Sequence, residues 1–244
     1  YGQFFVNFRS WKEVFFIPRS GAKFRSLAYD GFHAWTDDIN KNIQYTSSNV
    51  ITQDGAYFCP TDHYDFYEDS KGRVWASSGN GVYYFKSSDV GQHPLSVIRP
   101  KVPRNDGSGL ADYLLDGITV YQIREDASGY KWIATASGLF KVSNDGTEIL
   151  ETFTTANAPF SSDVVYSVCP NLNNNSVYVG TPDGLFEYYS TTTPPQEDFS
   201  NVVAYPNPIR PDYTGPVTIT GLMNNTLVKI VNVGGQVVAN LQSA

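Results

Sequence analysis

The chain has 244 residues and a formal net charge of −7, and aromatic residues make up 15% of it. An acidic chain lacks the basic face that nucleic acids require, so its charge argues against a nucleic-acid-binding protein. The sequence contains no apolar run of the roughly 18 residues that cross a membrane, and it opens without a signal peptide. Its Tyr, Phe, Val and Thr content, interrupted by Gly, Asn and Asp, favours strands over helices and predicts an all-β fold.

The first 60 residues have the composition of strands but follow no clear period. Because the chain begins with Tyr1, just before the strand-like residues 4–8, we expect it to be a fragment of a longer protein. The segment 29–35 (YDGFHAW) is a weaker copy of a repeat that becomes clear from residue 64. We expect these 60 residues to hold the end of one blade and much of another.

Three later segments share one pattern, and they span residues 68–85, 125–142 and 170–188. Each contains a polar turn, a strand in which a large aromatic residue precedes a small one by two positions, a second turn with glycine, and another strand. The equivalent positions are Asp69, Gly72, Trp75 and Gly81 in the first copy, Asp126, Gly129, Trp132 and Gly138 in the second, and Tyr178 and Gly184 in the third. Repeated antiparallel meanders of this length predict the blades of a β-propeller.

Each residue type in the repeat has a structural role. The aspartate hydrogen-bonds to the backbone of its own turn, and the glycines adopt positive φ without steric strain. Alternation along the strand at residues 130–135 creates two faces. One face carries Tyr130, Trp132 and Ala134, and the other carries Lys131, Ile133 and Thr135. We therefore expect the tryptophans to fill the space between neighbouring blades.

Residues 1–190 are thus expected to form a partial β-propeller of three to four blades. So few blades cannot close a ring by themselves. The remaining blades would come from a longer parent chain, or from a second copy in a homo-oligomer.

An insertion at residues 89–116 separates the first two copies. Arg99, Lys101 and Arg104 in this insertion are the best candidates for a ligand-binding site, because three cations on an acidic chain can attract an anionic glycan or partner. The alternative is a solvated loop without a ligand. Tyr64, Tyr67, Tyr83 and Tyr84 could stack on sugar rings, although strand alternation places most such side chains in the blade core.

The C-terminal part of the chain has a different character. Residues 191–200 form a polar linker that Pro194 and Pro195 keep extended. In residues 201–244 we expect three strands at 217–222, 227–233 and 236–241, with Gly234-Gly235 as a two-residue hairpin turn. We interpret this part as a small Ig-like β-sandwich that is truncated.

Patterns typical of catalysis or metal binding are missing from the sequence. His33, His63 and His93 share no ligand spacing, and no suitable nucleophile accompanies His63 and its neighbouring aspartates. We therefore expect no metal, no cofactor and no enzymatic activity.

The two cysteines, Cys59 and Cys169, also lack metal-ligand spacing. We expect two buried free thiols, and a disulfide between the two cysteines is the alternative.

The repeat resembles the propeller repeat of bacterial two-component sensors, Asp-x-x-Gly-x-x-Trp followed by Gly-[Leu/Val]-[Phe/Tyr]. The second copy fits best, with Asp126, Gly129, Trp132 and Gly138-Leu139-Phe140. The third departs from it, because Asn171 replaces the aspartate and Tyr178 replaces the tryptophan.

The end of the chain resembles the C-terminal sorting domain of type IX secretion cargo in Bacteroidetes. The matching residues are Tyr205-Pro206-Asn207-Pro208, Val217-Thr218-Ile219, Val228-Lys229-Ile230 and Gly235-Gln236-Val237-Val238. A sensor-type propeller followed by such a domain resembles the propeller-bearing surface subunit of the type IX attachment complex. The resemblance implies a place on the outer-membrane surface, with other secretion-complex subunits and an anionic lipopolysaccharide as partners.

The sequence thus favours a non-catalytic binding or scaffold protein of the cell surface or periplasm. One alternative is a periplasmic sensor domain that binds a polysaccharide fragment and signals to a kinase. A propeller hydrolase or lyase that acts on glycans is a third interpretation.

Overall fold

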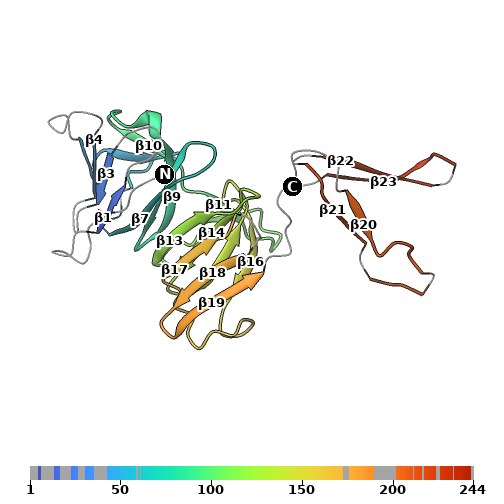
Figure 1. Ribbon diagram of the computed structural model, residues 1–244. Coiled ribbons are helices and arrows are strands. Elements are labelled where there is room, and N and C mark those ends of the chain that lie inside the picture. The colour runs from blue at the N-terminus through green and yellow to red at the C-terminus, as the bar shows by residue number, and fades with distance from the viewer. Residues whose placement is uncertain are drawn as a thin grey trace.

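A computed structural model shows a chain built from strands (Figure 1). It describes residues 5–6, 14–16, 23–26, 31–35, 43–58, 60, 62–172, 176–189, 202–210, 212–215, 217–223, 226–232 and 234–242. Within these residues the only helical element is the short 3-10 turn η2 (Ser87–Asp89). The expected all-β class is therefore confirmed.

The three predicted repeats each form an antiparallel sheet whose strands follow one another in chain order. The first contains β7 (His63–Glu68), β8 (Arg73–Ser78) and β9 (Gly81–Lys86). The second contains β13 (Val120–Glu125), β14 (Lys131–Thr135), β15 (Gly138–Val142) and β16 (Ile149–Phe153). The third contains β17 (Ser167–Pro170), β18 (Ser176–Thr181) and β19 (Gly184–Tyr189). These sheets are the first, second and third blades, and the propeller-type fold is confirmed.

The blades fan out from their first strands. β13 lies beside both β7 and β17, so the first strands of successive blades are neighbours in space (Figure 1). The later strands of each blade extend outward from this line. In a propeller the first strands line the central axis, and here β7, β13 and β17 have that position.

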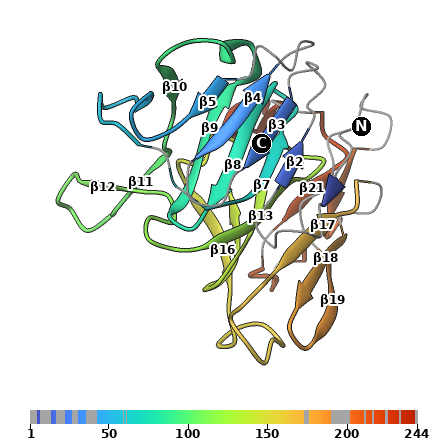
Figure 2. The same ribbon diagram turned by 90° about the vertical axis from the view of Figure 1, so that its left-hand side faces the viewer.

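An N-terminal sheet packs on the first blade. It contains β1 (Phe5–Val6), β2 (Val14–Phe16), β3 (Lys23–Ser26), β4 (Phe32–Trp35) and β5 (Ile43–Tyr45) in chain order. β4 lies beside the strands of the first blade (Figure 2). Its residues Phe32 and Ala34, in the weaker copy of the repeat, are fully buried in the apolar cluster that also contains side chains of the first blade. The first residues of that copy lie outside the described part of the chain.

The insertion after the first blade is ordered into strands. β10 (Leu95–Val97) continues the first blade, because the backbones of Ile98 and Tyr84 exchange hydrogen bonds of 2.8 and 2.9 Å. β6 (Val50–Thr52) pairs with β10 in parallel. β11 (Lys101–Pro103) and β12 (Ala111–Tyr113) pair with each other. Residues 99–116 are called the insertion hairpin below.

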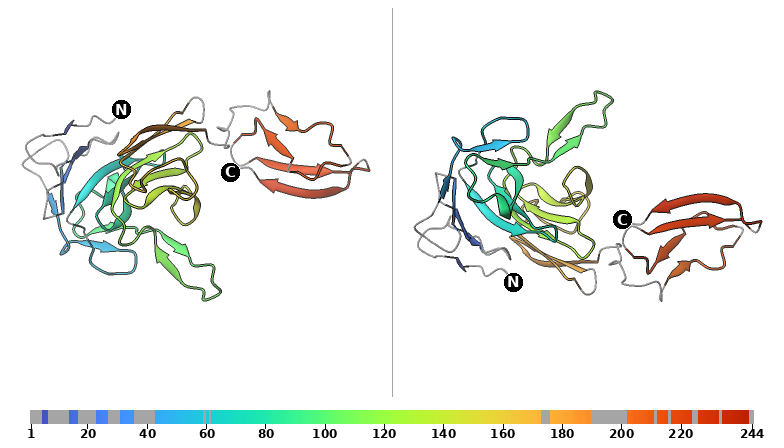
Figure 3. Two further views of the ribbon diagram at one scale, coloured as in Figure 1. Left: turned by 90° about the horizontal axis from the view of Figure 1, so that it is seen from below. Right: turned by 90° about the horizontal axis from the view of Figure 1, so that it is seen from above.

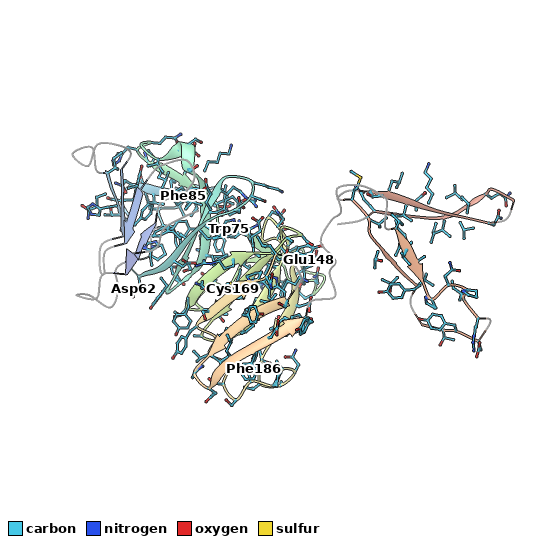
Figure 4. The ribbon with its side chains drawn as sticks, in the orientation of Figure 1. Asp62, Trp75, Phe85, Glu148, Cys169 and Phe186 are labelled. Carbon is cyan, nitrogen blue, oxygen red and sulfur yellow. The ribbon has the colours of Figure 1, made fainter. Side chains whose placement is uncertain are left out.

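Among the described residues, buried apolar side chains form three layers, each between neighbouring sheets. The layer between the N-terminal sheet and the first blade includes Phe66, Tyr83 and Phe85. The layer between the first and second blades includes Trp75, Ile123 and Ile133. The layer between the second and third blades includes Trp132, Val168 and Val179. Figure 4 labels one side chain of each layer, Phe85, Trp75 and Phe186.

The two faces of β14 point into different layers. Trp132 and Ala134 contribute to the layer with the third blade, whereas Ile133 contributes to the layer with the first. All three side chains are fully buried. The predicted alternation is therefore confirmed, and the tryptophans do fill the space between blades.

Asp69 and Asp126 connect the first turn of each blade to its tryptophan. One oxygen of Asp69 accepts backbone N–H bonds from Lys71 and Arg73 at 3.0 and 2.9 Å. The other oxygen accepts the indole N–H of Trp75 at 2.9 Å. Asp126 repeats the arrangement with its own turn, and its bond from the Trp132 indole measures 3.0 Å.

Glycine is required at the second turn of the first two blades. Gly81 and Gly138 have φ values of 84° and 126°, which disfavour any side chain. A Cβ atom would also lie 2.8 Å from the carbonyl oxygen of Leu115 at Gly81, and 2.6 Å from that of Phe153 at Gly138. The backbone of the following segment therefore approaches closely at both sites.

A buried group of charges joins the first and second blades. The ammonium of Lys131 is fully buried and lies 3.0 Å from Glu125 of its own blade and 3.6 Å from Asp69 of the first. Glu125 in turn accepts bonds from the Ser70 backbone N–H and hydroxyl at 2.6 and 2.9 Å. Arg73 bonds to Asp69 at 2.7 Å and reaches the Asn144 carbonyl of the second blade at 2.7 Å.

These contacts set the pKa values of the group. Burial lowers the pKa of Lys131, although Glu125 and Asp69 oppose this shift. Burial favours a raised pKa for Asp69, but the Trp75 indole, Arg73 and Lys131 outweigh it and hold the pKa below its ordinary value. Asp126 differs, because there burial dominates and raises the pKa.

The C-terminal residues form two two-stranded sheets, which lie apart from the blades (Figure 3). β20 (Val203–Tyr205) pairs with β21 (Thr218–Thr220), and β22 (Leu227–Val231) pairs with β23 (Val237–Gln242). Strands therefore occur in all three predicted places. The Ig-like sandwich and the domain division stay predictions, and the linker at 191–200 lies outside the described residues.

The turn between β22 and β23 corrects the predicted two-residue hairpin. The last paired residues are Val231 and Val237, so the turn is longer. The Asn232 side chain accepts the backbone N–H groups of Gly234 and Gln236 at 3.0 Å each. Of the two glycines only Gly235 has a positive φ.

We predict that Asp69→Ala lowers the free energy of unfolding by about 3–5 kcal/mol, because it leaves a buried indole N–H and buried cations without their shared acceptor. Urea unfolding at pH 7 measures the change. The matched control is Asp145→Ala, which removes an exposed turn carboxylate that bonds to Ser143 and Thr147 and is expected to cost no more than about 1 kcal/mol. Equal losses in both variants would contradict a special role for Asp69.

Candidate functional site

The insertion hairpin carries the three predicted cations, and each of them contacts a carboxylate. Arg99 and Lys101 both contact the ring of Tyr113, whereas Arg104 lies beside Asp112. Arg99 lies 2.5 Å from Asp116, Lys101 lies 2.8 Å from Asp54, and Arg104 lies 2.5 Å from Asp112. The site therefore carries as many anionic partners as cations, and it is locally balanced rather than basic.

Arg99 is the buried member of the three. Its guanidinium carbon lies 4.0 Å from the ring centroids of both Phe58 and Tyr113, so the cation is held between two aromatic faces. The backbone of Arg99 also exchanges hydrogen bonds of 3.0 and 2.7 Å with the Gln53 side chain. With 7% of its surface exposed, Arg99 connects the hairpin to the loop after β6.

Lys101 and Arg104 are exposed, in contrast. The Asp54 carboxylate accepts bonds from Lys101 and from the Tyr113 hydroxyl at 2.8 and 2.6 Å. These two bonds lower the pKa of Asp54, and the same contacts raise the pKa values of Lys101 and Tyr113. The bidentate bond from Arg104 likewise lowers the pKa of Asp112. Both pairs are ionised at neutral pH and open to solvent.

His63 and Asp65, the residues closest to a catalytic pattern, are built into the packing. The Nε2 atom of His63 lies 2.6 Å from the Tyr83 hydroxyl, and its ring stacks on Phe66. Burial lowers the pKa of His63 to about 3. Asp65 pairs with Arg124 at 2.5 Å and accepts the Ile123 backbone N–H at 3.1 Å. Among the described residues, no group of three or more His, Cys, Asp or Glu side chains could hold a metal.

Cys169 contradicts the expectation of two buried thiols. It is a free cysteine on β17 and is exposed, because it lies on the face of the third blade that no further sheet covers among the described residues (Figure 4). Cys59 lies outside the described part of the chain.

Two of the four tyrosines proposed for sugar stacking are packed. Tyr83 is fully buried, and Tyr84 packs on Trp75 with ring centroids 4.7 Å apart. Tyr64 is half-buried and belongs to a row that the sequence analysis missed. Its ring centroid lies 5.4 Å from that of Tyr121, which lies 5.3 Å from that of Tyr166. The sequence does carry a signal for this row, because Tyr64, Tyr121 and Tyr166 precede Asp69, Asp126 and Asn171 by the same number of residues.

We predict that Arg99 and Arg104 differ in their contribution to stability. Arg99→Ala is expected to lower the free energy of unfolding by about 2–3 kcal/mol, because a buried guanidinium loses two aromatic contacts and its ion pair with the exposed Asp116. Arg104→Ala is expected to leave stability unchanged within error, because its ion pair is exposed. Chemical unfolding of both variants measures the difference, and similar stabilities would show that the Arg99 stack contributes nothing.

His63 is expected to couple stability to pH. Its folded pKa of about 3 lies below the ordinary 6.5, so the unfolded chain binds the extra proton as the pH falls below 6.5. Stability is then lost at up to about 1.4 kcal/mol per pH unit. Asp65 has the opposite effect on stability, because burial raises its folded pKa to about 6. The folded chain therefore takes up this proton at a higher pH than the unfolded chain does, which offsets part of the loss. Unfolding at pH 7, 6 and 5 should therefore show wild type losing stability relative to His63→Gln.

The control for that measurement is His93→Gln, because His93 is exposed. This variant should follow wild type at each pH. If His63→Gln also follows wild type, the imidazole is not held neutral in the core.

Comparison with known proteins identifies similar folds. No protein-family model and no curated protein sequence matches the chain. Among solved structures it is similar to PorZ, described as an essential bacterial surface component of the type-IX secretion system of Porphyromonas gingivalis. The identity is 28% and the TM-score 0.71, over 94% of this chain and 32% of PorZ. The chain thus spans about a third of the length of that structure.

Two extracellular domains from B. thetaiotaomicron are also similar. The domain of the hybrid two-component system BT3049 is 18% identical over 76% of this chain and 22% of its own length, with a TM-score of 0.54. The domain of the system BT4673 is 15% identical over 94% of this chain and 31% of its own length, with a TM-score of 0.52. In the described residues, no helix has the length and apolar character needed to cross a bilayer. The chain therefore resembles PorZ along nearly its whole length, and it shares its fold with the two extracellular domains.

Proposed function

We propose that the chain is part of a non-catalytic surface or periplasmic scaffold that resembles PorZ, works with other subunits of a type IX secretion complex and binds anionic glycan such as lipopolysaccharide. The observation that carries the proposal is the similarity to PorZ over 94% of the chain. The similarity to the two extracellular domains from B. thetaiotaomicron lies below 20% identity and supports a common fold only. A sensor role is therefore the second interpretation.

The insertion hairpin is the proposed anion-binding site. Lys101 and Arg104 carry permanent charge at an exposed surface, and their present partners are the exposed carboxylates of Asp54 and Asp112. Exposed ion pairs are weak and are screened by salt. A polyanion that presents several charges at once can therefore replace the two carboxylates as the partner of these cations.

Arg99 contributes to this site through position rather than through direct binding. Because it is held between Phe58 and Tyr113, it fixes the base of the hairpin from which Lys101 and Arg104 project. Tyr113 contributes twice, since it also bonds to Asp54. The hairpin thus holds two cations with replaceable carboxylate partners on an ordered support.

The test uses binding of an acidic polysaccharide, polygalacturonate, to the full chain, with dextran as the neutral comparison. Lys101→Ala/Arg104→Ala should weaken binding about tenfold at low salt, whereas Asp54→Asn/Asp112→Asn should strengthen it about threefold, because it frees both cations. Raising the ionic strength should reduce these differences.

Lys71→Ala/Lys86→Ala is the matched control, because it removes the same charge from exposed lysines outside the hairpin. Equal weakening by the two double variants would show that net charge, and not this hairpin, determines binding. Failure of wild type to bind the polyanion would refute the anionic-glycan proposal.

A further inference from the structure

The tyrosine row of Tyr64, Tyr121 and Tyr166 is placed by the backbone in the same way in each blade. The pairing of β7 with β8 shifts register between His63 and Asp65, which makes Tyr64 the extra residue of a β-bulge. The pairing of β13 with β14 shifts in the same way around Tyr121. In the third blade the N–H of Tyr166 bonds to Gly180 at 2.9 Å, although Gly180 is already the partner of Ser167.

A bulge changes the direction of a side chain, and bulges are frequent next to functional sites. Here each bulge places one tyrosine outside the alternating pattern whose side chains fill the layers between blades. The three residues lie at the beginning of the first strands, which line the axis. The tyrosines are therefore gathered at one end of the axis, opposite the turns that contain Asp69 and Asp126.

The row is accessible and firmly supported. Tyr64 and Tyr121 are half-buried and Tyr166 is 53% exposed. Within the described part of the chain, none of the three hydroxyls has a hydrogen-bond partner. The backbone beneath them is fixed between blades, because Asp65 accepts the N–H of Ile123 at 3.1 Å and Gln122 accepts that of Val168 at 2.8 Å. The rings are thus ordered before any ligand arrives, which lowers the entropic cost of binding.

The chemistry of the row fits a sugar chain. The rings of Tyr64 and Tyr121 meet edge-to-face at 82°, and those of Tyr121 and Tyr166 are tilted by 60°, so the row offers ring faces in different directions rather than one flat platform. An accessible ring face can contact the C–H groups of a pyranose, and a hydroxyl can bond to its polar groups. The ring centroids are 5.4 and 5.3 Å apart, which is comparable with the length of one sugar residue in a polysaccharide. The charged groups next to the row on the same strands, Asp65 and Arg124, pair with each other at 2.5 Å. The surface is therefore suited to neutral sugar units.

We propose that Tyr64, Tyr121 and Tyr166 form a binding surface for the neutral sugar residues of a glycan chain at one end of the propeller axis. This inference extends the proposed glycan binding to a second site with different chemistry. The insertion hairpin attracts acidic groups, and the tyrosine row contacts uncharged sugar rings.

The test is saturation-transfer NMR and calorimetric titration of the full chain with neutral hexasaccharides of glucose and of mannose. Wild type should bind at least one of them, with little dependence on salt. Tyr121→Ala and Tyr166→Ala should each weaken binding about tenfold, as loss of a central aromatic side chain does at other binding surfaces. Tyr121→Phe keeps the ring and should retain most of the affinity.

The control is Tyr189→Ala, which removes a tyrosine that is 65% exposed on the third strand of the same blade as Tyr166. Affinity for the hexasaccharide should not change in this variant. If Tyr121→Ala does not fold, Tyr166→Ala still decides the question, because Tyr166 is largely exposed.

Two results would overturn the inference. One is that no neutral hexasaccharide binds to wild type, and the other is that binding persists in both alanine variants. Neither result affects the hairpin, whose binding of polygalacturonate is measured separately and depends on Lys101 and Arg104. Conversely, loss of polyanion binding would leave a positive result with neutral hexasaccharides intact.

Discussion

The hydrogen bond from a tryptophan indole to a turn aspartate is the constraint on which the blades depend. A tryptophan fills the gap between two sheets, but it also takes an N–H group into the interior, where an unpaired donor costs about 1–3 kcal/mol. Asp69 and Asp126 accept that N–H while they also bond to the backbone of the preceding turn. The path of the chain and the position of its largest side chain are therefore fixed together.

The sequence predicted this part of the fold because its signals are local. The turn aspartate, the glycine and the tryptophan lie within seven consecutive residues, from Asp69 to Trp75. Alternation along β14 then indicated correctly that Trp132 and Ile133 face different neighbours. Such signals do not depend on which blade is the neighbour, so the periodicity of the sequence was sufficient to predict the structure of a blade.

Contacts between distant segments could not be predicted in the same way. The sequence predicts that Lys131 and Trp132 lie on opposite faces of one strand. It does not reveal that the Lys131 ammonium lies close to Asp69 of the preceding blade. The cations of the insertion were recognised, yet Asp54, the partner of Lys101, belongs to a loop 47 residues earlier. A pattern of charges along the chain therefore indicates candidate residues. The net charge of the site that they form depends on which distant carboxylates the folded insertion contacts.

The two ends of the first strands serve different physical needs. At one end, Asp69 and Asp126 bond to the tryptophans, and the turn of the first blade also bonds to the second blade. Packing therefore determines which residues occur in these turns. At the other end, a bulge in each blade leaves one residue outside the apolar layers on both faces of the blade. Packing would allow a small polar side chain at that position. The chain instead carries Tyr64, Tyr121 and Tyr166 with their hydroxyls unpaired in the described structure. Packing between blades does not account for three adjacent rings at an accessible surface, whereas recognition of an amphipathic ligand does.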